Sequence, residues 1–150
     1  MTDYFVLEWM APNPITISPR TTLSEANRIM KDHRVRRLPV VDEGKLVGII
    51  TTGDLREAAP SMATSLSVFE LTYLLDKVSV DKIMRRNVIT VSPKTSVRDA
   101  AEIMLQNKIS GLPVVDMKRV VGIITESDLF RMMVRDMTSE AGKAPTNKSG

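Results

Sequence analysis

The sequence predicts an α/β (α+β) fold in which one small unit, strand–helix–strand–strand–helix, occurs twice. The first observation is an internal repeat: a shift of about 74 residues aligns 10–57 with 84–131 without a gap, and about 22 of the 48 aligned positions are identical. The second is periodicity, because each copy alternates short β-branched runs with segments whose apolar residues recur at helical spacing. Two repeats are too few for a solenoid, so we expect them to pack on each other.

The elements of the first repeat follow from strand runs, helix caps and turn residues. They are expected as a strand over Ile15–Ile17, a helix capped by Thr22, strands over Leu38–Val41 and Lys45–Ile50, and a helix from about Thr51. A turn at Asp42-Glu43-Gly44 joins the two longer strands, since glycine tolerates positive φ. In the second repeat the corresponding helices are expected after Ser96 and from about Thr125.

The domain organisation follows from these elements. We expect a first repeat over 1–57 with an N-terminal helix or arm, a helical linker over 58–79, a second repeat over 80–137, and a disordered tail over 138–150. In the linker, apolar residues recur at helical spacing, which predicts a helix that covers the second repeat: Leu66, Phe69, Tyr73 and Leu74.

Composition argues against several classes of protein. The 150 residues have a net charge of +3 and no cysteine, and the one histidine, His33, lies in a basic run. Catalytic and metal sites of the common kinds are therefore not expected, and the chain is predicted not to be an enzyme. No apolar run is long enough for a membrane span and no signal peptide is visible, so we expect a cytoplasmic protein. Nucleic acid is a minority expectation, because Lys and Arg alternate with Asp and Glu and aromatics make up only 4%.

A motif that occurs twice carries the functional hypothesis. Gly48-Ile49-Ile50-Thr51-Thr52-Gly53-Asp54 returns as Gly122-Ile123-Ile124-Thr125-Glu126-Ser127-Asp128. One interpretation is structural: threonine and aspartate three residues apart cap a helix, which contributes about 1 kcal/mol without any ligand. The other is binding, because a helix N-terminus attracts phosphate and an aspartate in its first turn can accept both hydroxyl groups of a ribose. The motif alone leaves both interpretations open.

A second feature favours an anionic ligand in the first repeat. Arg36 and Arg37 directly precede the buried strand that begins at Leu38, and two adjacent guanidinium groups there call for an anion or carboxylate nearby. The second repeat has Ser110-Gly111 at these positions. The first site is therefore expected to be more basic than the second.

Paired units that carry Leu-Pro-Val-Val-Asp and Gly-Ile-Ile-Thr-x-x-Asp resemble tandem cystathionine β-synthase (CBS) domains, also called a Bateman module. The resemblance covers about Val6 to Met137 and holds twice. It implies a pseudo-twofold pair with two clefts that bind AMP, ADP, ATP, S-adenosylmethionine or related adenosyl compounds. It assigns Asp54 and Asp128 to the ribose and places Thr51 and Thr125 beside it. Around the adenine it places Thr16, Thr90, Leu38, Pro39, Leu112 and Pro113, and toward the phosphate it places Arg36 and Arg37, with Ser110 as the counterpart of Arg36.

The expected function is therefore that of a stand-alone CBS pair that senses an adenine nucleotide. Ligand binding would shift the population of arrangements of repeats or subunits. A homodimer is expected, together with an effector protein of unknown identity acting in trans, and no cofactor. Three alternatives stay open: a module for S-adenosylmethionine or another adenosyl ligand, a ligand-free dimerisation module, and a nucleic-acid-binding protein.

Overall fold

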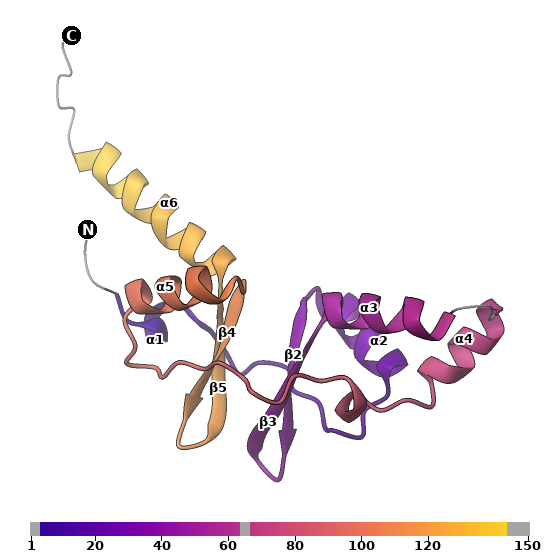
Figure 1. The fold of residues 1–150 in the computed structure, drawn as a ribbon. Helices are drawn as coiled ribbons and strands as arrows, with labels where there is room; N and C mark the ends of the chain where they lie inside the picture. Colours follow the sequence, from indigo (N-terminus) through magenta and orange to yellow (C-terminus); the bar gives the residue numbers. More distant parts are fainter. Residues whose placement is uncertain (1–3, 64–66, 144–150) are drawn as a thin grey trace. The chain divides into compact units, whose positions relative to one another are not determined.

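The computed structural model describes residues 4–63 and 67–143. Contacts within the chain group the residues into two compact units (Figure 1). The unit that contains the first repeat comprises Asn13–Ile89 and Met117–Val120. The unit that contains the second comprises Met1–Pro12, Thr90–Asp116 and Val121–Gly150. We call them the first-repeat unit and the second-repeat unit and describe each by itself.

The first-repeat unit begins with helix α2 (Leu23–His33). The helix starts where predicted, because the Thr22 side chain accepts a hydrogen bond of 3.1 Å from the Glu25 N–H. Leu23, Ala26 and Met30 form its buried face. The helix stops at Arg34, whose φ of 55° leaves the right-handed helical region.

The strands β2 (Arg37–Asp42) and β3 (Lys45–Thr51) form an antiparallel hairpin in which Arg37 lies opposite Thr51 (Figure 1). Both predicted strands are confirmed, and Gly44 in their turn has a φ of 78°. The strand predicted over Ile15–Ile17 is wrong, since only Ile17 pairs with β2, at Val40. Prolines at 14 and 19 bracket this segment, and proline has no N–H to extend a ladder.

Two further helices complete the first-repeat unit: α3 (Thr52–Ala63) follows β3 directly, and α4 (Val68–Leu75) lies in the predicted linker. Helix α4 packs against α2 and α3 and buries none of its residues. The contacts group this helix with the first-repeat unit. That it covers the second repeat stays a prediction, and Leu66 lies outside the described residues. A short 3₁₀ helix, η1 (Val80–Lys82), follows, and its Val80 is fully buried.

The second-repeat unit repeats this plan with helix α5 (Val97–Asn107), strands β4 (Gly111–Asp116) and β5 (Arg119–Thr125), and helix α6 (Glu126–Lys143). Ser96 caps α5 as predicted, since its side chain accepts a hydrogen bond of 3.0 Å from the Asp99 N–H. Helix α6 continues beyond Met137, where the sequence led us to expect its end. The disorder predicted for the tail lies, for 144–150, outside the described residues.

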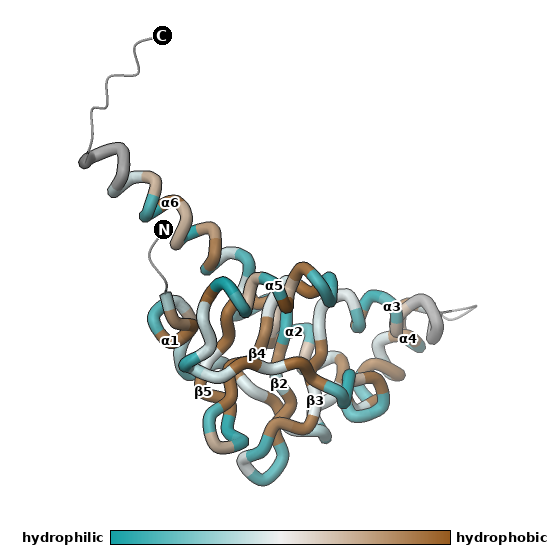
Figure 2. The backbone as a smooth tube through the Cα atoms, turned by 60° about the vertical axis from the view of Figure 1, so that its left-hand side comes forward, coloured by the Kyte–Doolittle hydropathy of each residue, from teal (hydrophilic) through white to brown (hydrophobic). Residues whose placement is uncertain are grey.

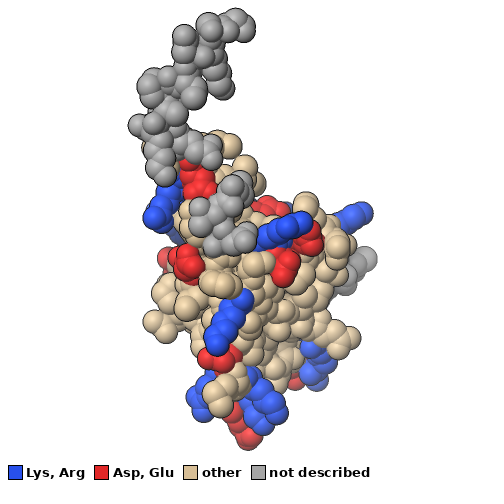
Figure 3. Space-filling model, turned by 90° about the vertical axis from the view of Figure 1, so that its left-hand side faces the viewer, with Lys and Arg blue, Asp and Glu red and all other residues tan. Residues whose placement is uncertain are grey.

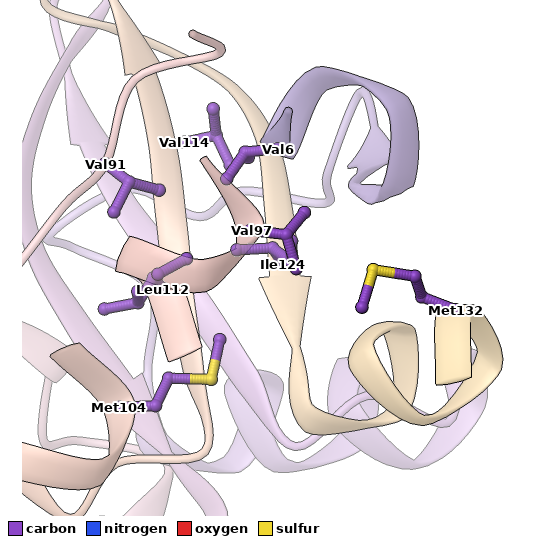
Figure 4. Close-up of a cluster of buried hydrophobic side chains, with 9 residues drawn as sticks. Val6, Val91, Val97, Met104, Leu112, Val114, Ile124 and Met132 are labelled. Carbon is purple, nitrogen blue, oxygen red and sulfur yellow. The ribbon is translucent and has the colours of Figure 1, made fainter. Parts of the chain in front are cut away.

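Each unit has its own apolar core. The strands are mostly brown in Figure 2, with teal at the hairpin turns, as expected for buried strands joined at the surface. Figure 4 shows one core, in which Val6 lies among side chains of the second repeat. Corresponding residues fill both cores: Leu23, Met30, Leu38, Val40 and Ile50 in one, and Val97, Met104, Leu112, Val114 and Ile124 in the other.

The segment at the start of each repeat belongs to the unit of the other repeat. Helix α1 (Val6–Trp9) and strand β1 (Ala11–Pro12) belong to the second-repeat unit, where β1 pairs with β5 and gives the sheet order β1-β5-β4. Likewise, Arg85 forms a backbone bridge with Ile49 of β3 in the first-repeat unit. The sequence placed the N-terminal arm with the first repeat, whereas the structure groups it with the second.

Candidate functional site

Helix α3 begins with two reciprocal hydrogen bonds between Thr51 and Asp54. The Asp54 N–H donates to Thr51 Oγ1 at 3.1 Å, and the Thr51 N–H donates to Asp54 Oδ2 at 2.9 Å. These bonds are the predicted cap, because each side chain satisfies a backbone N–H at the helix start. The cap occupies only one carboxylate oxygen of Asp54, whose exposed fraction is 8%.

The chain that leads into β2 lies beside this helix start. The Thr52 N–H donates to the Arg36 carbonyl oxygen at 2.9 Å, and the backbone of Arg37 is paired with Thr51. Arg36 is exposed and Arg37 is half-buried. The fold thus brings four predicted site residues of the first repeat into one neighbourhood: Arg36, Arg37, Thr51 and Asp54.

The remaining predicted residues of the first repeat lie on β2 and on the segment around Ile17 that is hydrogen-bonded to it. Leu38 and Pro39 are buried in β2, and the Ile17 N–H donates to the Pro39 carbonyl oxygen at 3.1 Å. Thr16, directly before that bond, is exposed. Their predicted role around an adenine ring stays a prediction.

The second repeat has a similar helix start at α6, except that the Thr125 hydroxyl donates to Asp128 Oδ2, at 3.3 Å, whereas the Thr51 hydroxyl accepts from the Asp54 N–H. The Thr125 N–H donates to Asp128 Oδ2 at 2.8 Å, and the exposed fraction of Asp128 is 4%. The Glu126 N–H donates to the Ser110 carbonyl oxygen at 3.0 Å, as Thr52 does to Arg36. Among the other predicted residues, Thr90 is exposed, while Leu112 and Pro113 are buried in β4.

An arginine that was not among the predicted residues binds each buried aspartate. Arg85 contacts Asp54 Oδ1 through Nε and Nη2, both at 3.1 Å. Arg131, one turn along α6, forms an ion pair with Asp128 Oδ1. The signal in the sequence is a break in the repeat: the counterpart of Arg85 is Ala11, and the counterpart of Arg131 is Glu57.

These arrangements are suited to binding. Each combines a helix N-terminus, which favours negative charge, with a buried carboxylate that accepts hydrogen bonds. Among the described residues, no three His, Cys, Asp or Glu side chains are grouped to hold a metal ion. Within the same part of the chain, no helix is long and apolar enough to cross a membrane.

Charge over the surface gives no further site on the face drawn in Figure 3. Basic and acidic side chains are interspersed there, as the alternation in the sequence predicts. Nucleic-acid binding relies on a basic patch or stripe along the phosphate backbone. This face has no such stripe over the residues that the structure describes.

Comparison with protein families gives two matches to the CBS domain family, over residues 6–61 and 80–135. CBS domain-containing protein YhcV of Bacillus subtilis (strain 168) is 32% identical over 145 residues, which cover 96% of this chain and 94% of YhcV.

Solved CBS pairs have the same fold along nearly their whole length. The pair of protein MJ0100, in complex with 5′-methylthioadenosine and S-adenosyl-L-methionine, superposes with a TM-score of 0.76 at 36% identity, covering 90% of this chain and 99% of that pair. CBSX2 of Arabidopsis thaliana, in complex with AMP, gives a TM-score of 0.74 at 29% identity, covering 89% and 98%. The resemblance drawn from the motifs is thereby confirmed, and the chain belongs to the CBS-domain family, with two CBS domains in tandem.

Proposed function

We propose that this chain is a regulatory module that binds adenine nucleotides at the helix starts of its two repeats. One observation carries the proposal: in each repeat a nearly buried aspartate uses Oδ2 for the helix cap and keeps Oδ1 outside it. A cap needs a single oxygen and no burial, so capping leaves the second oxygen to an exposed arginine, Arg85 or Arg131, that a ligand can displace. A ribose with two hydroxyl donors matches such a carboxylate. The AMP complex of CBSX2 supports an adenosine ligand.

The two sites are proposed to differ in ligand charge. Arg36 and Arg37 stand at the first, where their guanidinium groups suit the phosphates of AMP, ADP or ATP. The second has Ser110 and Gly111 there and fits an adenosyl ligand without phosphate. The MJ0100 pair, which binds 5′-methylthioadenosine and S-adenosyl-L-methionine, favours this second candidate.

The output of such a module is proposed to be a population shift passed to an effector in trans, from a homodimer in the cytoplasm. An apolar stripe on α6 supports a dimer: Phe130, Met133, Val134 and Met137 are exposed at helical spacing. With Leu105 of α5, the first half of the stripe borders a groove of about 650 Å³. A twofold contact of this stripe with its copy would cover it, and light scattering at micromolar concentration measures the mass.

The binding proposal is tested by thermal unfolding with AMP, ATP, S-adenosylmethionine and adenosine. A ligand at about 100 times its Kd stabilises by roughly 2.7 kcal/mol. Asp54→Asn and Asp128→Asn should then lower affinity about tenfold or more at their own sites, with little change in stability, because asparagine still caps a helix.

The matched controls are Asp42→Asn and Asp116→Asn, the same change at exposed hairpin positions of the two repeats. They should bind as the unmodified chain does. Absence of any stabilisation by the four compounds would instead support a ligand-free dimerisation module, with the aspartates serving as caps only.

A further inference from the structure

We propose that Arg85 is a specificity residue of the first site, one that makes binding of an adenosine ligand depend on its phosphate. This inference rests on the proposed function of that site. The first observation is that the two arginines come from different places in the chain relative to the aspartates they bind. The arginine on Asp128 comes from the same helix, three residues along the chain. The arginine on Asp54 comes from a separate segment, 31 residues along the chain.

The backbone of Arg85 is fixed, while its side chain is accessible. Its N–H donates to the Ile49 carbonyl oxygen at 2.9 Å, and its own carbonyl oxygen accepts from the Ile49 N–H at 3.0 Å. Its neighbour Met84 is buried against the first-repeat core. The Arg85 side chain is nevertheless 66% exposed. The guanidinium can therefore change its partner without any movement of the segment that carries it.

A ribose at Asp54 competes with this guanidinium. Oδ2 accepts one bond, from the Thr51 N–H, and can take one ribose hydroxyl, so the second hydroxyl must use Oδ1, which already receives both Nε and Nη2 of Arg85. A carboxylate oxygen has two lone pairs, and a ribose hydroxyl that donates to Oδ1 displaces one of these arginine bonds. Binding thus loosens the hold of Asp54 on a cation beside the ligand.

The next partner of the loosened guanidinium depends on the ligand. A 5′-phosphate attached to the same ribose offers the guanidinium a new anionic partner, often a bidentate one. Adenosine offers none, so its binding weakens the ion pair without replacement. The second site has Ala11 at the corresponding position of its bridging strand β1. The dependence on phosphate exerted from this position is therefore specific to the first site.

The test compares AMP and adenosine by calorimetry in full-length chains that also carry Asp128→Asn, which confines tight binding to the first site. Arg85→Ala should weaken AMP binding about tenfold or more, with adenosine unchanged or tighter. Arg85→Gln is the second variant, because it keeps an amide donor near Asp54 if the alanine variant folds poorly. Arg86→Ala is the matched control: it removes the same charge one residue along, where the side chain contacts the Asp81 carbonyl oxygen instead. It should change both affinities by less than about twofold.

The possible outcomes test the role of Arg85 and the proposed function separately. Loss of AMP affinity alone supports the role of Arg85. Equal losses for AMP and adenosine, or no loss while AMP still binds the parent, would overturn that role and leave the proposed function standing. A parent chain that binds neither compound would overturn the proposed function and, with it, this inference.

Discussion

A single methyl group at Gly48 should loosen the contact that holds Arg85 beside Asp54. A Cβ built at Gly48 would lie 2.5 Å from Met84 Sδ and 3.1 Å from the Arg85 carbonyl oxygen, well inside the usual contact of about 3.5–4.0 Å. Met84 is buried, so its sulfur cannot simply turn into solvent. Forced overpacking costs about 1–3 kcal/mol, whereas loss of glycine freedom in the unfolded chain returns about 0.4–1 kcal/mol. The cost of overpacking is the larger of the two, so Gly48→Ala should lower the free energy of unfolding by about 1–2 kcal/mol.

Thermal unfolding followed by circular dichroism measures this effect. For a chain of this length the expected fall in Tm is about 2 to 8 °C. Gly53→Ala is the matched control, because a Cβ there meets only Thr51 Oγ1, at 3.6 Å, within helix α3. The same substitution should therefore raise stability at Gly53 and lower it at Gly48. Equal or higher stability of Gly48→Ala would refute the reasoning that close packing fixes the Arg85 segment.

Two further predictions follow from the same structure. Residues 80–150 expressed alone should show no cooperative unfolding transition, because they lack Val6 and β1, which belong to the second-repeat unit; a folded monomer of this fragment would contradict that. Replacing both Arg36 and Arg37 by alanine should weaken AMP and ATP by several kcal/mol while adenosine changes little, and the preference should shrink as salt rises. Calorimetry at two salt concentrations measures it, and equal losses for all three ligands would mean that the arginines only shape the site.

The sequence was sufficient for the features that depend on neighbouring residues. The caps at Thr22 and Ser96, both hairpins and both motif helices lie where periodicity and cap chemistry predict them. The family also followed from short motifs, because these motifs encode local turns and helix starts. Local pattern was therefore a reliable guide to the fold within each repeat.

Features that depend on contacts between residues far apart in the sequence could not be predicted from local pattern. Residues 10–12 have no periodicity of their own, and they are placed by the pairing of β1 with β5 and the packing of Met10 beside Gly122. The helix over Val68–Leu75 has the pattern of a covering element, yet its side chains Phe69 and Tyr73 are exposed. The sequence marks Arg85 only as a break in the repeat, and its contact with Asp54, 31 residues away in the chain, is visible only in the structure.

The grouping of α1 and β1 with the second-repeat unit has a consequence for how the chain folds as it is made. Residues 13–89 hold nearly all of the first-repeat unit and can form it early in synthesis. Helix α1 and strand β1 cannot pack until β5 and α6 have been made. The roughly 120 residues from Pro12 to Met132 take about 6 to 24 s to synthesise. During that interval Val6 and Met10 have no core to enter. This segment is made before the elements it packs against and is thus among the last to fold, and its apolar side chains are open to chaperones in the meantime.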